Sequence, residues 1–201
     1  GAFIMRGAPS PAQQVARARA DELPGLWDSN MDQIGHLLRA SQHKGNFSTA
    51  LDAAAEPVLA LITRDPDLAI FQVVRQEEGQ ARQYASRHAV HAGIASFLSA
   101  RRLGWSDNEV RCVFRAALTM NLSMVELQNR LANQLTPVTP LQRDQIHSHP
   151  ERSVQMLQQA GVTDEAWLRA VAQHHESVDR SGYPEGIGDP SELATLLARA
   201  D

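Results

Sequence analysis

Apolar residues recur along most of the chain at the spacing of an α-helix. In the stretch "SDNEVRCVFRAAL", for example, Val110, Val113, Phe114 and Ala117 follow one another at i, i+3, i+4 and i+7. This spacing places all four side chains on one face of a helix. No stretch shows the strict alternation of apolar and polar residues that a half-buried strand requires. The pattern therefore predicts an all-α protein.

Helix starts can be read from capping residues. A serine or threonine followed three residues later by glutamate or glutamine satisfies the free amide groups at the start of a helix. The predicted starts are "SDNE" from Ser106, "TPLQ" from Thr139 and, by the same scheme, "DPSE" from Asp189. The periodicity predicts further helices over residues 12–22, 28–42, 48–63, 67–79, 82–102, 151–160 and 163–175.

The breaks between helices bear on the domain organisation. Proline and glycine interrupt helical hydrogen bonding, and "GNF", "RDPD" and "LTPVTP" are the clearest examples in the chain. A length of 201 residues suits one compact domain with an N-terminal extension. We therefore expect an N-terminal helical segment over residues 1–80 and a helical core over residues 81–201.

Composition excludes several functional classes. A formal net charge of -4 provides no broad basic surface, which argues against DNA as a partner. Cys112 is the single cysteine and cannot form an internal disulfide, so a cytoplasmic location is expected. No apolar run approaches the roughly 20 residues that span a bilayer, so this domain is expected to make no membrane contact.

Histidines gather in the C-terminal half of the chain. Six of the eight lie at positions 88, 91, 147, 149, 174 and 175. In the predicted helix "DEAWLRAVAQHHE", both imidazoles share a face with Trp167 and Val171 and should point inward. An unsatisfied buried polar group costs about 1 to 3 kcal/mol, so His174 and His175 need partners. Spacing alone leaves open backbone carbonyls, water, a role in capping the helix end, and a metal ion as explanations.

The segment "HHESVDRSGYPEGI" resembles the signature of HD-GYP domains, the bacterial signalling branch of the HD metal-dependent phosphohydrolases. Three more segments resemble family motifs in the same order: "SRHAVHAG", "VTPLQRDQIHSHPERSVQML" and "LARAD". Together these segments span about residues 48–201. The resemblance implies an HD-domain-like helical bundle that holds two or three metal ions, usually iron or manganese, and hydrolyses cyclic di-GMP.

The chain departs from the family where the metals should be bridged. The family has a segment like "AALLHDIGK", whereas this chain reads "AALTMNLSM". Met120 stands at the histidine, Asn121 at the bridging aspartate and Met124 at the lysine. A thioether is a poor ligand for manganese or iron, and a neutral amide cannot offset the repulsion between two divalent cations about 4 Å apart. Tyr84 falls near a glutamate that supports a third metal in some members.

Five positions that correspond to ligands are retained. The resemblance implies that His149, His174 and His175 belong to one metal, and that His88 and Asp201 are what is left of the other. Three imidazoles suffice for one ion with an open position. The expected cofactor is therefore one divalent ion of iron, manganese or zinc, or none.

A loop with a family role follows the histidine pair. It contains Asp179, Arg180, Gly182, Tyr183 and Pro184, and Arg180 replaces the usual glycine. In the family such loops are linked to substrate binding or to diguanylate cyclase partners. The resemblance thus implies a diguanylate cyclase or another signalling protein, or cyclic di-GMP itself, as a partner.

Three other residues lie close to these motifs in the sequence. Glu176, like Asp179, resembles a signature position that orients its neighbours without binding metal; the alternative is a helix-end charge that helps to form the turn. His91 is expected to be a partly buried polar residue in preference to one flanking the pocket. His147 is expected to be a solvated helix residue in preference to a partner of the metal ligands.

The leading hypothesis is a degenerate HD-GYP-like signalling domain that has lost phosphodiesterase activity and works by recognition. The alternative is an active metal-dependent phosphohydrolase with an altered centre, mononuclear on the three clustered histidines. A third hypothesis is a structural helical adaptor with an empty pocket. The sequence leaves open which of these is correct.

Overall fold

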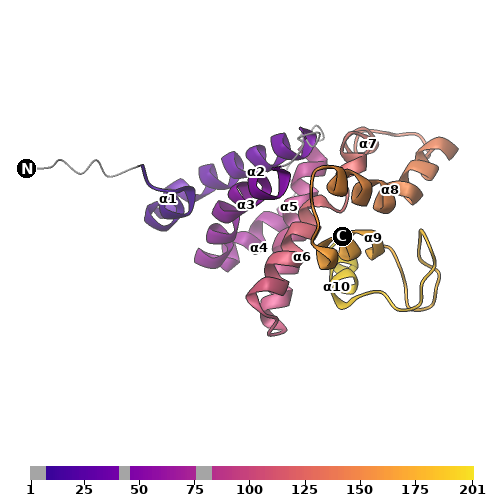
Figure 1. Ribbon diagram of the computed structural model, residues 1–201. Helices are drawn as coiled ribbons and strands as arrows, with labels where there is room; N and C mark the ends of the chain where they lie inside the picture. The colour runs from indigo at the N-terminus through magenta and orange to yellow at the C-terminus, as the bar shows by residue number, and fades with distance from the viewer. Residues whose placement is uncertain (1–7, 41–45, 76–82) are drawn as a thin grey trace, which may run out of the picture.

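The computed structural model describes residues 8–40, 46–75 and 83–201, and in these ranges the regular elements are helices, with no strand (Figure 1). The predicted all-α fold is confirmed. The helices are α1 (Pro11–Arg17), α2 (Leu23–Arg39), α3 (Phe47–Arg64), α4 (Pro66–Val74), α5 (Tyr84–Arg102), α6 (Asp107–Thr119), α7 (Val125–Leu131), α8 (Pro140–Gln159), α9 (Glu165–Gln173) and α10 (Glu192–Ala200). Short 3-10 turns cover Ala20–Glu22 and Leu122–Met124.

Two of the three predicted helix starts are correct. Ser106 and Thr139 both form complete capping boxes at the starts of α6 and α8. The third start is wrong by two residues, because Ser191 and not Asp189 caps α10. The backbone amide of Ser191 donates to the side chain of Gln173 at 2.9 Å, which holds Ser191 just outside the helix.

Several predicted helix bounds also need correction. The helix predicted over residues 12–22 ends at Arg17, where the Arg64 guanidinium donates to the carbonyls of Val15 and Ala18. The helix predicted over residues 151–160 is the second half of α8, which continues through Pro150. α2 begins at Leu23, earlier than expected, and the end predicted for the helix over residues 67–79 lies outside the described residues.

Helices from both halves of the chain share one apolar core. The main buried cluster extends from Val15 in α1 to Leu197 in α10 and includes residues of α2, α3, α5, α6 and α9. In Figure 1, α1 to α4 lie on one side of α5 and α6, and α7 to α10 lie on the other. The division near residue 80 stays a prediction, since that residue lies outside the described ranges.

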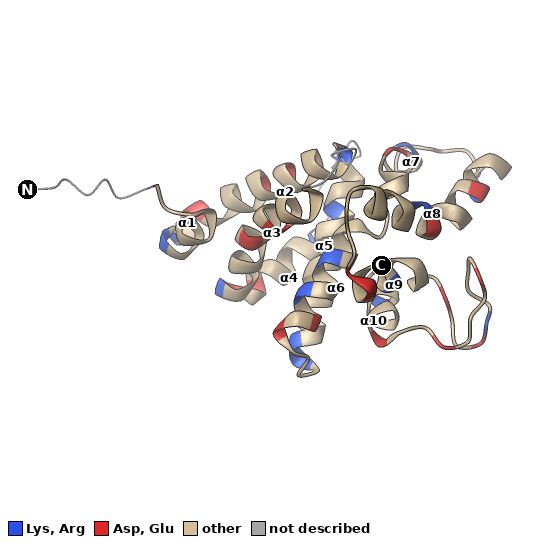
Figure 2. Ribbon diagram, viewed as in Figure 1, with Lys and Arg blue, Asp and Glu red and all other residues tan. Residues whose placement is uncertain are grey.

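Charged residues of both signs are interspersed along the helices (Figure 2). Among the described residues, no helix is long and apolar enough to cross a membrane.

Candidate metal centre

The structure brings three of the predicted ligands together. His149 comes from the middle of α8, and His174 and His175 come from the turn that follows α9. One nitrogen of each ring can be chosen so that the three atoms all lie within 4.8 Å of one another. His149 and His174 are 1% and 0% exposed, whereas the side chain of His175 is 26% exposed. The inward orientation expected for the pair therefore holds fully for His174 and partly for His175.

The backbone fixes which nitrogen of each buried ring carries the proton. His149 Nδ1 donates to the carbonyl of Ile146 at 2.5 Å, and His174 Nδ1 donates to the carbonyl of Val171 at 2.7 Å. The Ile146 carbonyl is available because Pro150 has no N–H to form the usual helical hydrogen bond with it. The His-Pro pair thus orients its own imidazole.

With both Nδ1 atoms protonated, each Nε2 carries a lone pair. These two Nε2 atoms lie 3.0 Å apart in the protein interior. Two facing acceptors repel each other unless a cation or proton lies between them. Two nitrogen ligands about 2.1 Å from one ion are about 3.0 Å apart at an angle of about 90° and about 3.4 Å apart at a tetrahedral angle, so the spacing is close to that of two ligands of one metal ion.

The electrostatics favour neutral rings. Burial, together with the nearby His175, lowers the pKa of His149 to about 4, although the hydrogen bond with the Ile146 carbonyl acts in the opposite direction. Burial likewise lowers the pKa of His174, assisted by the adjacent imidazoles of His175 and His149. Metal-binding histidines must be neutral, so the cluster is ready to bind a cation at neutral pH.

The low pKa of His149 predicts that acid destabilises the metal-free protein. The unfolded chain binds a proton at the ordinary pKa of 6.5, whereas the folded chain binds it only at about 4. This group therefore makes its whole contribution to the free energy of unfolding above about pH 6.5. The contribution is lost as the pH falls from about 6.5 to about 4, and about 2 kcal/mol of it is lost at pH 5. Urea unfolding in the presence of a chelator, repeated between neutral pH and about pH 5, measures the change. Stability that stays constant or rises on acidification would contradict the prediction.

The two residues expected for the second metal form a different arrangement. His88 Nε2 lies 2.7 Å from one carboxylate oxygen of Asp201, and Asn121 Nδ2 donates to the same oxygen at 3.4 Å. His175 Nε2 lies 3.6 Å from the other oxygen. Burial alone would raise the pKa of Asp201, but the hydrogen bond with His88 and the nearby imidazoles lower it to about 2. The carboxylate is thus satisfied by side chains of this chain.

The residue at position 121 lies beside Asp201 and affects whether this part of the site needs a cation. An aspartate here would place a second anion beside Asp201 and would call for cations between them. Asn121 instead directs an amide N–H at the carboxylate, and this pairing needs no cation.

The other two replaced positions are part of the interior. Met120 is 0% exposed and belongs to the main core cluster, and Met124 is also buried. A thioether suits an apolar environment, where an unpaired ammonium at position 124 would be strongly disfavoured. Both methionines are therefore packing side chains in this structure.

The loop after the histidine pair folds back over the site. Glu176 accepts hydrogen bonds from the amides of Glu185 and Ile187 at 2.8 and 3.0 Å, so its side chain holds the loop. The amide of Tyr183 donates to the carbonyl of His175 at 3.0 Å. The loop is thus attached to the same turn that presents the histidines.

The Tyr183 ring lies against two imidazoles. Its centroid is 4.6 Å from that of His175 and 4.7 Å from that of His147, with interplanar angles of 23° and 6°. His147 is exposed as expected, but its stacking on Tyr183 was missed. Sequence spacing could not predict this stacking, because the two rings come from α8 and from a loop that is distant in the sequence.

Arg180 adopts the conformation that the glycine of the signature would favour. Its φ of 63° lies in the left-handed region, where a residue with a Cβ is strained. Asp179 supports the turn by accepting hydrogen bonds from the amide and hydroxyl of Ser181 at 3.0 and 2.6 Å.

We expect Arg180→Gly to stabilise the protein by about 1 kcal/mol, because glycine adopts positive φ without a steric penalty. Thermal or urea unfolding measures the change. Arg180→Ala, which keeps the strain and removes the side chain, serves as the control. A glycine variant no more stable than the alanine variant would contradict this account.

Two residues of α5 line the neighbourhood of His88. Tyr84 stacks on the His88 ring at a centroid distance of 5.9 Å. His91 is partly buried, as expected, and burial lowers its pKa to about 4. Tyr84 has no carboxylate, so the third metal position of some family members has no corresponding ligand at this residue.

Comparison with known proteins identifies the fold. The model of a family described as "HD domain" matches residues 70–193, which is more than half of the chain and includes His88 and the histidine cluster. The chain belongs to the HD domain family. The relationship predicted from the motifs is thereby confirmed.

Two curated relatives of this HD domain are cyclic dinucleotide phosphodiesterases. "Cyclic di-GMP phosphodiesterase PA4108" of Pseudomonas aeruginosa is 25% identical over 207 residues, covering 97% of this chain and 46% of the relative. "3'3'-cGAMP-specific phosphodiesterase 3" of Vibrio cholerae is 26% identical over 120 residues, covering 59% of this chain and 26% of the relative. The chain thus spans less than half the length of either relative. No solved structure matches it with significance.

Proposed function

We propose that this HD domain does not hydrolyse cyclic dinucleotides and acts in signalling by recognition. The observation that carries the proposal is the hydrogen bond from the Asn121 amide to Asp201, at the position where hydrolysis requires a bridging carboxylate. The domain would bind cyclic di-GMP without cleaving it, or would bind a signalling protein such as a diguanylate cyclase.

The electrostatic argument is quantitative. Two divalent cations about 4 Å apart repel each other by on the order of 15 kcal/mol, even at an effective dielectric constant of 20. A two-metal centre depends on anionic ligands between the ions to offset this repulsion. Asn121 is neutral, and Asp201 is the one carboxylate that the described residues place against the histidines. A pair of ions should therefore not assemble here.

The half of the site formed by His149, His174 and His175 fits a single divalent ion, which we propose to be iron, manganese or zinc. When bound, such an ion would act as a Lewis acid towards a phosphate oxygen. The chain itself supplies ring orientation through the Ile146 and Val171 carbonyls, and a flat aromatic wall in Tyr183.

The loop containing Asp179, Arg180, Gly182, Tyr183 and Pro184 is the proposed contact region for the ligand or partner. It is anchored by Glu176 and by the backbone of His175, so its shape is tied to the histidine site. The names of the two relatives support a cyclic dinucleotide as the class of ligand.

A second candidate function is a phosphohydrolase with one metal, and the three-histidine cluster favours it. Both functions are tested by incubating the protein with cyclic di-GMP and manganese or iron, measuring linear product and counting bound metal. We expect no product and at most one ion per chain. Calorimetry with cyclic di-GMP then separates ligand binding from an adaptor with an empty pocket.

The decisive variant restores the family residues through Met120→His, Asn121→Asp and Met124→Lys together. Hydrolysis that appears only in this variant would show that these three positions account for the loss. Asn133→Asp, the same chemical change at an exposed site after α7, is the matched control. Hydrolysis by the unchanged chain, or two bound ions per chain, would refute the proposed function.

A further inference from the structure

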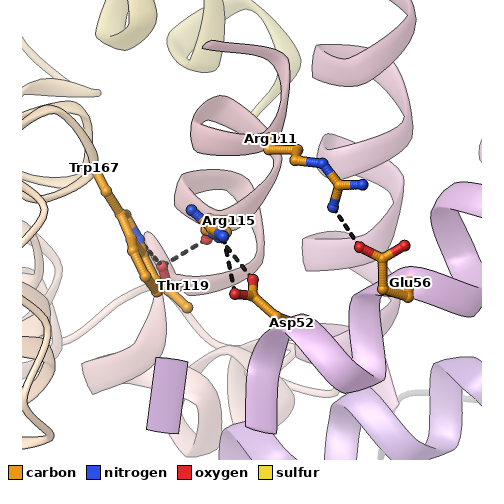
Figure 3. A network of polar contacts seen from close by, with 6 residues as sticks. All are labelled: Asp52, Glu56, Arg111, Arg115, Thr119 and Trp167. Carbon is orange, nitrogen blue, oxygen red and sulfur yellow. Dashed lines mark hydrogen bonds and ion pairs between the residues drawn. The ribbon is translucent and has the colours of Figure 1, made fainter. Parts of the chain in front are cut away.

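Two ion pairs connect α3, in the N-terminal part of the chain, to α6. Arg115 makes a two-pronged contact with Asp52 at 2.7 and 2.9 Å, and Arg111 pairs with Glu56 one turn away (Figure 3). A groove of about 660 Å³ lies between α1, α3, α5 and α6, with Glu56 and Arg111 in its lining. The two ion pairs therefore form a polar connection between α3 and α6.

Only the first of these pairs continues towards the metal centre. The Arg115 guanidinium lies over the ring of Trp167 in α9, with its central carbon 5.8 Å from the ring centroid. In Figure 3, Arg115 lies between Trp167 on one side and Asp52 on the other, whereas Arg111 is directed to Glu56 alone. Both ion pairs thus join α3 to α6, but only Arg115 also contacts Trp167 of α9.

Trp167 is also held by a second contact from α6. Its Nε1 donates to the hydroxyl of Thr119 at 2.8 Å, and that hydroxyl donates to the Arg115 carbonyl at 2.8 Å. Thr119 and Trp167 are both buried. Thr119 is followed by Met120 and Asn121, so the same anchor lies next to the altered positions.

The orientation of Trp167 sets the direction of the histidines. Trp167, Val171 and His174 follow one another at spacings of four and three residues, so they lie on one face at the end of α9. The Val171 carbonyl holds the His174 ring. A rotation of α9 that moved Trp167 would therefore move the His174 Nε2 away from that of His149.

We propose that Asp52 and Arg115 are positioning residues that couple the N-terminal helix α3 to the histidine site through Trp167. The metal-binding part of this inference rests on the proposed function. The coupling acts through a partly buried, bidentate charge pair and a cation held over an indole, both of which fix the angle of approach between helices. A displacement of α3 would then change the positions of the His174 and His175 rings.

The test compares Asp52→Asn with Glu56→Gln. Both changes remove one charge of α3 that pairs with an arginine of α6, but only Asp52 is connected to Trp167. The first measurement is amide hydrogen exchange at the end of α9 in the metal-free protein. The second is the dissociation constant for Co²⁺, followed by its absorption spectrum. Circular dichroism checks that each variant is folded.

We expect Asp52→Asn to accelerate exchange at the end of α9 and to weaken Co²⁺ binding about three- to tenfold, while Glu56→Gln leaves both nearly unchanged. Arg115→Lys keeps a charge for Asp52 but loses the planar group over Trp167, and should give an intermediate effect if Asp52→Asn fails to fold. Equal effects of the two α3 variants, or none from Asp52→Asn and Arg115→Lys, would overturn the coupling. If the unchanged chain binds no Co²⁺, the proposed metal site fails, and hydrogen exchange alone decides the coupling.

Discussion

Replacing His174 with alanine is expected to weaken divalent metal binding by at least about 100-fold. His174 supplies one of three clustered nitrogens, and losing a ligand should exceed the roughly 10- to 100-fold effect of losing an outer hydrogen-bond partner. Titration with Co²⁺, Mn²⁺ and Zn²⁺ measures the affinity. Thermal unfolding gives a second reading, since metal at 100 times its dissociation constant should stabilise the unchanged protein by about 2.7 kcal/mol and the variant hardly at all.

His36→Ala is the matched control for this experiment. His36 is an exposed histidine of α2, outside the cluster, so its loss should leave metal affinity unchanged. If His36→Ala and His174→Ala reduce binding equally, the metal is held elsewhere on the surface. If none of the three metals stabilises the unchanged chain, the repulsion between the Nε2 lone pairs of His149 and His174 is removed in another way, such as by a shared proton.

Gly182→Ala is expected to release the loop from the histidine site and to destabilise the protein by about 2 to 3 kcal/mol. A Cβ at position 182 would lie 2.4 Å from the carbonyl oxygen of His175 and 2.5 Å from the Cα of Glu176. Both obstacles are backbone atoms, so no flexible side chain can move aside. The same displacement would lengthen the bond from the Tyr183 amide to His175, and we expect Co²⁺ affinity to fall about tenfold as a consequence.

Gly25→Ala provides a contrast with the opposite sign. Gly25 lies in α2, and a Cβ there would meet nothing within 4 Å. Alanine is a better helix former than glycine, so this variant should be more stable by about 1 kcal/mol and should bind metal normally. Urea unfolding of the two variants side by side measures both effects. A Gly182→Ala variant as stable as the unchanged chain would show that the loop does not depend on this close approach.

The helical fold could be predicted from local information. The apolar spacing around Val110 and Phe114, and the capping boxes at Ser106 and Thr139, each act within one or two turns and are visible in sequence. The same is true of residue types that bind metal. The inward orientation of the His174-His175 pair follows from helical spacing, whereas the grouping of His149 with this pair as metal ligands follows from the resemblance to HD-GYP motifs.

What sequence could not supply depends on contacts between distant segments. Asn121 reads as the loss of a bridging anion, but its bond to Asp201 requires the end of α10 to lie beside α6. The stacking of Tyr183 on His147 and the cation of Arg115 over Trp167 likewise join different helices or loops. Each is set by packing angles between elements, and residue spacing within one element contains no information about them.

Pro150, in the middle of α8, determines the orientation of the imidazole beside it. A helix ordinarily tolerates such a residue as a defect, yet here the vacated acceptor on Ile146 is what selects one tautomer of the neighbouring ring. In His149 and Pro150, the missing backbone hydrogen bond of the proline and the orientation of the histidine ring therefore depend on each other. Because of this arrangement, the His149 ring is held with its Nε2 directed at the Nε2 of His174.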